Sequence, residues 1–209
     1  MTHTEHLKQL SDIRDIMEKS SRFLSLSGLS GVFAGFYALI GAGLFYYYCK
    51  VNRGVDIISS THTHLLLLDR QTIISGMLIA VMVLILSLLT GIYFTTRKAK
   101  RKGLSIWHQT TWRLIVSLAI PLGTGGFFCL LLLKYGLFSL IGPATLIFYG
   151  LALLNGSKYT LEEVRFLGIS EIILGLISMY FIGYGIFFWV IGFGFLHILY
   201  GWYMYKKHG

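Results

Sequence analysis

The chain has 209 residues, of which 55% are hydrophobic and only 13% charged, whereas soluble domains carry roughly 25% charged residues. This composition excludes an ordinary soluble domain. Because the few charges lie between long apolar stretches, it predicts one transmembrane domain. The net charge of +9 does not indicate a nucleic-acid partner, because no base-reading motif accompanies the basic residues.

Residues 1–22 precede the first apolar stretch and predict an amphipathic helix. Leucine, isoleucine and methionine recur at every third or fourth position from Leu7 to Met17, with charges of both signs between them. Such spacing is typical of a helix with one apolar face. We expect this helix to lie at the cytoplasmic interface or against the bundle. The first span lies too far from the start for a cleavable signal peptide, so we expect it to be an uncleaved anchor.

The remaining chain predicts an all-α, polytopic membrane protein with six spans. The transmembrane domain covers residues 23–205, and residues 206–209 form a short tail. The expected spans are 23–48, 72–96, 112–133, 137–154, 166–182 and 186–205. From Ile172 to Tyr205, 34 residues pass without Asp, Glu, Lys or Arg, about twice the ~17–25 that one crossing needs. Gly183-Tyr184-Gly185 is therefore the predicted turn of a helical hairpin.

The distribution of lysine and arginine predicts the orientation. Every second gap is rich in them, so that fourteen of the 18 fall on one side and four on the other. Cytoplasmic loops carry the excess of basic residues. Both termini are therefore expected in the cytoplasm. The densest basic run is expected to meet anionic lipid headgroups; it consists of Arg97, Lys98, Lys100, Arg101 and Lys102.

A stripe of small residues marks one face of the first span. Its members are Ser27, Gly31, Ala34, Gly35, Ala38 and Ala42. Offsets of three, four and seven place them on one helix face, where they allow another helix to approach closely. We favour packing within the chain over a seam between two copies, and a homo-oligomer stays open as the alternative.

Two prolines fall within predicted spans. Pro121 lies in the third and Pro143 in the fourth. Membrane helices tolerate proline when neighbouring groups satisfy the carbonyl that loses its hydrogen bond. Both prolines are therefore expected to kink their helices without breaking them.

The two cysteines are both predicted near the outer face. Cys49 ends the first span, and Cys129 lies close to the outer end of the third. A disulfide could form in an oxidising compartment. Two free thiols are favoured, because no CxxC spacing marks a redox site.

Glu171 and His197 are the candidate polar pair. Glu171 lies thirteen residues before Tyr184 and His197 thirteen after it, so an antiparallel hairpin brings them to one depth. An ionisable group inside a membrane usually faces the bundle and has a partner. We expect a hydrogen-bonded or ion-paired contact, with Tyr200 as its third member. The pair could carry a proton or hold a polar ligand, but a structural contact is favoured, and no catalytic residue is assigned.

No cofactor or metal is predicted. A membrane haem b needs two axial ligands at bundle depth, and His197 alone lies there. The run Thr61-His62-Thr63-His64 offers two histidines without a third ligand, which is a weak pattern for a metal site.

Three segments carry a resemblance to a known group. They are Ser20-Ser21-Arg22-Phe23-Leu24-Ser25-Leu26-Ser27-Gly28-Leu29-Ser30-Gly31, Pro143-Ala144-Thr145-Leu146-Ile147-Phe148-Tyr149-Gly150, and Ser157-Lys158-Tyr159-Thr160 continuing through Glu171 to Gly175. Together they resemble a family of uncharacterised small inner-membrane proteins of Bacteroidota, over nearly the whole chain. The resemblance implies a bacterial inner-membrane location and transfers no functional residue.

Three function classes follow from these observations. The leading hypothesis is a non-enzymatic membrane protein with an interaction or envelope-related role. The second is a small transporter or channel in which Glu171, His197 and the prolines line a path. The third is an intramembrane enzyme that acts on a lipid or quinone, with Glu171 and His197 as an acid–base pair.

Overall fold

The computed structural model describes residues 26–53, 70–101, 103 and 109–208, and every regular element in these ranges is helical. The long helices are α2 (Gly28–Arg53), α3 (Arg70–Arg101), α4 (Gln109–Lys134), α5 (Ile141–Gly156) and α6 (Glu162–Tyr180). A final helix, here the C-terminal helix, consists of α7 (Gly185–Trp189), the π-helical η4 (Val190–Leu196) and α8 (His197–His208). The all-α class is confirmed. The predicted helix over 1–22 lies outside the described residues.

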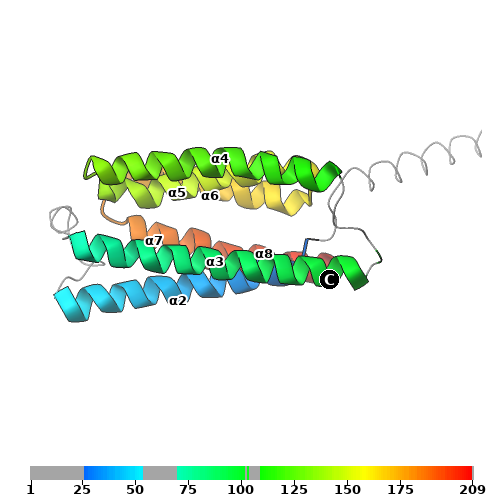
Figure 1. The fold of residues 1–209 in the computed structure, drawn as a ribbon, viewed down its shortest axis with the longest axis horizontal. Coiled ribbons are helices and arrows are strands. Elements are labelled where there is room, and N and C mark those ends of the chain that lie inside the picture. Colours follow the sequence, from blue (N-terminus) through cyan, green and yellow to red (C-terminus); the bar gives the residue numbers. More distant parts are fainter. Residues whose placement is uncertain (1–25, 54–69, 102, 104–108, 209) are drawn as a thin grey trace, which may run out of the picture.

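The helices run side by side along the long axis of the bundle (Figure 1). α5 packs against both α4 and α6, and α2 packs against both α3 and the C-terminal helix. The 3-10 segment η2 (Phe138–Leu140) leads into α5, and η3 (Ser157–Tyr159) follows it. The last turns of α3 and α8 lie at one end of the bundle, here the basic end, and α2 ends at the opposite end.

Five helical segments are long and apolar enough to cross a membrane. They are Gly28–Asn52, Arg70–Arg101, Gln109–Lys134, Phe138–Tyr159 and Gly185–His208. α6 does not qualify, because its 19 residues include Glu163, Arg165 and Glu171. The structure thus confirms a multi-pass helical membrane protein. α3 also continues through the basic run as far as Arg101, beyond the predicted end at residue 96.

The small-residue stripe of α2 faces the C-terminal helix. A Cβ atom added to Gly201 would lie 2.6 Å from the backbone nitrogen of Val32, and one added to Gly35 would lie 2.6 Å from the carbonyl oxygen of Gly194. Ser27, Ala38 and Ala42 are buried, and Ala34 is half-buried. In this structure the stripe packs within the chain.

A second close approach joins α5 to α6 and was not predicted. A Cβ on Gly150 would lie 2.6 Å from the Gly168 carbonyl oxygen, and a Cβ on Gly168 would lie 2.8 Å from the Gly150 carbonyl oxygen. Because each backbone occupies the space of the other's missing side chain, both positions need glycine.

Pro121 lies inside α4, and α5 supplies the compensation. Proline has no N–H to donate to the carbonyl four residues earlier, which is that of Ser117. The side-chain Nδ2 of Asn155 on α5 donates to this same Ser117 oxygen at 2.9 Å. The helix remains continuous across the proline, as predicted, because a neighbouring helix satisfies the freed acceptor.

Pro143 lies within the span Phe138–Tyr159, as predicted. α5 begins at Ile141, so Pro143 is its third residue. In the first turn of a helix the missing N–H would have no intrahelical partner in any case. Pro143 therefore lies next to the junction between η2 and α5.

The Pro121–Asn155 relation predicts a specific coupling. Asn155→Ala should lower the free energy of unfolding by about 1 kcal/mol, because it leaves the Ser117 carbonyl without a donor. In a Pro121→Ala background the backbone N–H of residue 121 can serve that carbonyl, so the cost should fall toward zero. Thermal unfolding in detergent measures both. Lys158→Ala is the control, because it removes the other side-chain contact of Asn155 and leaves the hydrogen bond to Ser117 in place. Its cost should be the same in both backgrounds. Equal costs of Asn155→Ala in the two backgrounds would contradict the relation.

Candidate functional site

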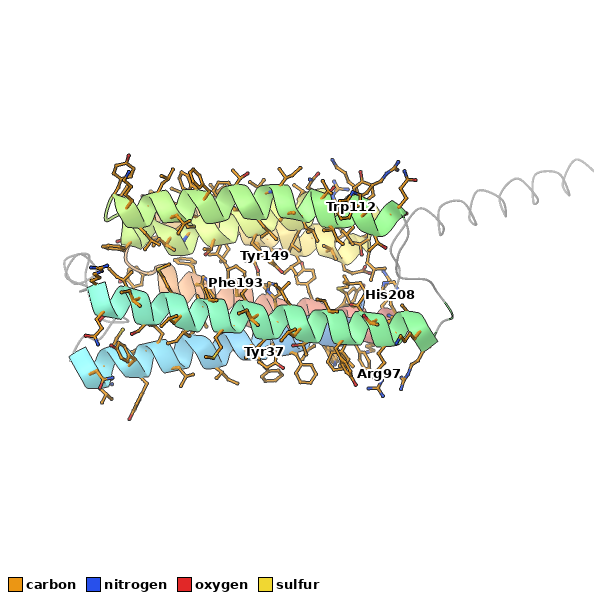
Figure 2. All side chains as sticks on the ribbon, in the orientation of Figure 1. Tyr37, Arg97, Trp112, Tyr149, Phe193 and His208 are labelled. Carbon is orange, nitrogen blue, oxygen red and sulfur yellow. The ribbon has the colours of Figure 1, made fainter. Side chains whose placement is uncertain are left out.

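A buried polar cluster lies where α5, α6 and the C-terminal helix meet. It contains Tyr149 from α5, Glu171 from α6 and His197, the first residue of α8. Glu171 is 0% exposed and His197 only 5% exposed, and Tyr149 is half-buried. Figure 2 shows Tyr149 and Phe193 projecting toward each other between the two sets of helices.

The imidazole of His197 makes the contacts that define the cluster. Its Nδ1 lies 2.9 Å from the carbonyl oxygen of Gly192 and its Nε2 lies 2.8 Å from the hydroxyl of Tyr149. A carbonyl oxygen only accepts, so this contact assigns the proton to Nδ1. In a neutral ring Nε2 then accepts from the Tyr149 hydroxyl. The structure therefore brings Glu171 and His197 together, but the third member is Tyr149.

Tyr200 does not belong to the cluster. It is half-buried, and no hydrogen bond joins it to Glu171 or His197 in the part of the chain that the structure describes. The prediction of Tyr200 is wrong because it assumed that the partner lay one α-helical turn along the same helix. The hydroxyl comes instead from α5, which packs closely against α6.

The π-helical segment η4 explains why His197 can reach a backbone carbonyl of its own helix. A π turn bonds residues five apart, so the change back to α spacing shifts the hydrogen-bond ladder. At this junction the His197 backbone N–H donates to Gly194, and its side chain takes the Gly192 carbonyl five residues back. Gly192 also makes room for the acid, because a Cβ there would lie 2.5 Å from Glu171 Oε2 and would displace the carboxyl group.

Glu171 is the unusual member of the cluster. Its Oε1 lies 3.4 Å from His197 Nδ1, yet neither carboxyl oxygen has a hydrogen-bond partner among the described residues. Two proton arrangements fit this contact, a neutral acid beside a neutral imidazole or a carboxylate beside an imidazolium. Both keep the pair neutral overall, which is the condition for burying ionisable groups in a low-dielectric region.

Aromatic rings enclose the cluster. The Phe193 ring lies 5.0 Å from that of Tyr149 and 5.8 Å from that of His197, centroid to centroid. Trp189 lies on the other side of Phe193 at 4.9 Å. Neither of the two best-formed cavities among the described residues is lined by Tyr149, Glu171 or His197. The cluster is thus packed rather than open to a channel or a binding cleft.

A second polar cluster ties the basic end together. Glu163 at the start of α6 accepts from Lys207 Nζ at 2.7 Å and contacts His208 Nε2 at 3.2 Å. Burial opposes ionisation of Glu163, and the hydrogen bond from the Lys207 ammonium favours its carboxylate form. Lys98 Nζ donates to the carbonyl oxygens of His208 and Leu26 at 2.7 and 3.3 Å.

Apart from Lys98, the described residues of the basic run and the two cysteines lie outside both polar clusters. Arg97, Lys100 and Arg101 are exposed, and Lys102 lies outside the described residues. Cys49 is buried and Cys129 half-buried, and no disulfide joins them. Within the described ranges, no three His, Cys, Asp or Glu side chains gather closely enough to hold a metal ion.

Comparison of the chain with protein-family models, with curated proteins and with solved structures finds no match. The geometry of this chain therefore carries the functional argument.

The cluster predicts a measurable coupling between α5 and the C-terminal helix. Tyr149→Phe and His197→Ala should each lower the free energy of unfolding in detergent. Because both variants remove the same hydrogen bond, the double variant should lose less than the sum of the two single losses, by at least about 0.5 kcal/mol. Tyr200→Phe is the matched control and should show no coupling to His197→Ala. Additive costs for Tyr149 and His197 would contradict the hydrogen bond.

Proposed function

We propose that this chain is a non-enzymatic protein of the bacterial inner membrane that acts through binding within the bilayer. The observation that carries the proposal is the packing of the Tyr149–Glu171–His197 cluster. A catalytic or transporting carboxyl must be reachable by its substrate, whereas Glu171 is 0% exposed and lines neither cavity.

The same cluster is well placed to hold helices together. One imidazole contacts α5, α6 and the backbone of its own helix. Polar contacts of this kind join membrane helices, between which the hydrophobic effect supplies no drive. The cluster thus joins α5, α6 and the C-terminal helix through one imidazole, and its role is structural.

We further propose that α6 is the sixth crossing and that both termini face the cytoplasm. Its 19 residues span about 28 Å as an α-helix, close to the ~30 Å of hydrocarbon. It packs along α5, and its buried acid is partnered by His197. The excess of lysine and arginine at the basic end supports a cytoplasmic location for that end.

A proton-coupled transporter is the second candidate, and two observations favour it. Glu171 keeps both carboxyl oxygens without hydrogen bonds among the described residues, and it lies beside a π-helical segment, a feature frequent at functional sites. An alternative state that opened a path to Glu171 would let the carboxyl exchange its proton. No comparable observation favours an enzyme.

Proton flux distinguishes the two candidates. The protein is reconstituted into liposomes that hold a pH-sensitive dye, and an imposed pH gradient is followed with time. We expect wild type, Glu171→Gln and empty liposomes to decay alike, because no path reaches the carboxyl. The transporter would be established instead by a leak that wild type shows, that Glu171→Gln loses and that Glu162→Gln retains. Glu162 is the exposed acid on the same helix.

Cysteine labelling tests the proposed topology. In a background of Cys49→Ala and Cys129→Ala, single cysteines replace Lys100, Lys134 or Lys206, all of which are exposed. With six crossings, Lys100→Cys and Lys206→Cys should react with a membrane-impermeant maleimide only after the cells are opened, whereas Lys134→Cys should react from outside. Opposite sides for positions 100 and 206 would show that α6 does not cross.

A further inference from the structure

A well-formed apolar hollow lies away from the buried polar cluster. It has a volume of about 270 Å³ and lies between the outer parts of α2 and α3 on one side and η2, α5 and the C-terminal helix on the other. Residues that line it include Ala42, Phe45, Gly76, Ala80, Gly142 and Trp189. We name it the lateral groove, and its place in the fold does not depend on whether the protein transports protons.

The lateral groove opens between α3 and the helices that face it. Ala80 contributes only a methyl group to its wall, whereas Gly76 packs against the Phe45 ring and Gly142 against the backbone of Gly185. α3 packs closely against α2 but has no comparable contact with α4. The groove therefore lies where the fold brings the helices least closely together, and its wall is almost entirely apolar.

We propose that the lateral groove binds one acyl chain of an anionic phospholipid. An apolar hollow within the spanning helices is surrounded by hydrocarbon chains, and water gains no hydrogen bonds there. Its volume of about 270 Å³ lies just below the roughly 300–1,000 Å³ typical of ligand pockets. The groove thus accommodates a single hydrocarbon chain and excludes a large folded ligand.

The charge around the groove selects the headgroup. Arg70 is the first residue of α3 and lies one turn from Ile73 in the groove wall, while Lys134 ends α4 next to Leu133, another wall residue. Both side chains are exposed. All the acids that the structure describes, Glu162, Glu163 and Glu171, belong to α6 and none lines the groove. A phosphate without a compensating cation on its headgroup complements this basic rim.

Trp189 provides the probe for the test. It lines the groove, and substitution of Trp107, Trp112 and Trp202 by Phe leaves it as the single tryptophan. The full chain is placed in phosphatidylcholine nanodiscs that contain a minor fraction of a lipid brominated on an acyl chain. This brominated lipid is either phosphatidylglycerol or phosphatidylcholine. Bromine quenches tryptophan fluorescence at contact, so quenching reports occupancy of the groove by each lipid.

Two pairs of variants localise the effect. Ala80→Phe fills the groove, whereas Val81→Phe adds the same ring at an adjacent exposed position that does not line it. Arg70→Gln and Lys134→Gln remove the basic rim and leave the groove open. Each basic side chain near a phosphate contributes a preference of roughly fivefold.

We expect the brominated anionic lipid to quench Trp189 severalfold more strongly than the zwitterionic lipid at equal fraction. Val81→Phe should retain this excess, Ala80→Phe should abolish it, and Arg70→Gln with Lys134→Gln should equalise the two lipids. Equal quenching in wild type would overturn the headgroup preference. Two outcomes would overturn the site. The first is that neither lipid quenches Trp189, as when a second copy of the chain covers the groove. The second is that Ala80→Phe and Val81→Phe show identical quenching.

Discussion

Inside lipid, helices gain nothing from the hydrophobic effect when they associate, because lipid tails are as apolar as leucine. Close van der Waals contact and interhelical hydrogen bonds must replace it. This chain uses glycine for the first requirement in two places. α2 approaches the C-terminal helix through Gly28, Gly31 and Gly201, and α5 approaches α6 through Gly150 and Gly168. These two seams produce two helix pairs, which the remaining contacts must join.

The C-terminal helix joins those pairs. Along one face it packs its glycines against α2. At the π-helical junction it directs His197 toward Tyr149 on α5 and Glu171 on α6. At the basic end its last turn contacts Glu163 and Lys98. One helix therefore contacts members of both pairs at two depths.

The sequence predicts the elements of this arrangement better than their partners. Apolar length and charge placement determine the class and the approximate spans, and the charge-free run after Ile172 locates Glu171 and His197 at one depth. The stripe on α2 predicts a close approach, although the Gly201 partner is a tertiary property. Tyr149 and Gly192 could not be predicted, because periodicity contains no signal for the π turn that aims His197. The role of Asn155 could not be predicted either, because Pro121 indicates that a carbonyl loses its hydrogen bond but not which helix supplies the new donor.

The polar contacts are unevenly distributed along the bundle, and this unevenness gives the lateral groove its physical setting. From the basic end to the depth of His197, hydrogen bonds join the C-terminal helix to α5, α6 and α3. Beyond that depth α7 packs against α5 and α6, and no hydrogen bond joins α7 to either helix among the described residues. Dispersion contacts weaken steeply across a gap, so an empty hollow at this end would forfeit attraction on every wall. An acyl chain restores those contacts without requiring a hydrogen bond, and the rim of Arg70 and Lys134 holds its phosphate. On this proposal the lipid completes the packing at the end of the bundle opposite the basic end, where polar contacts do not join the helices.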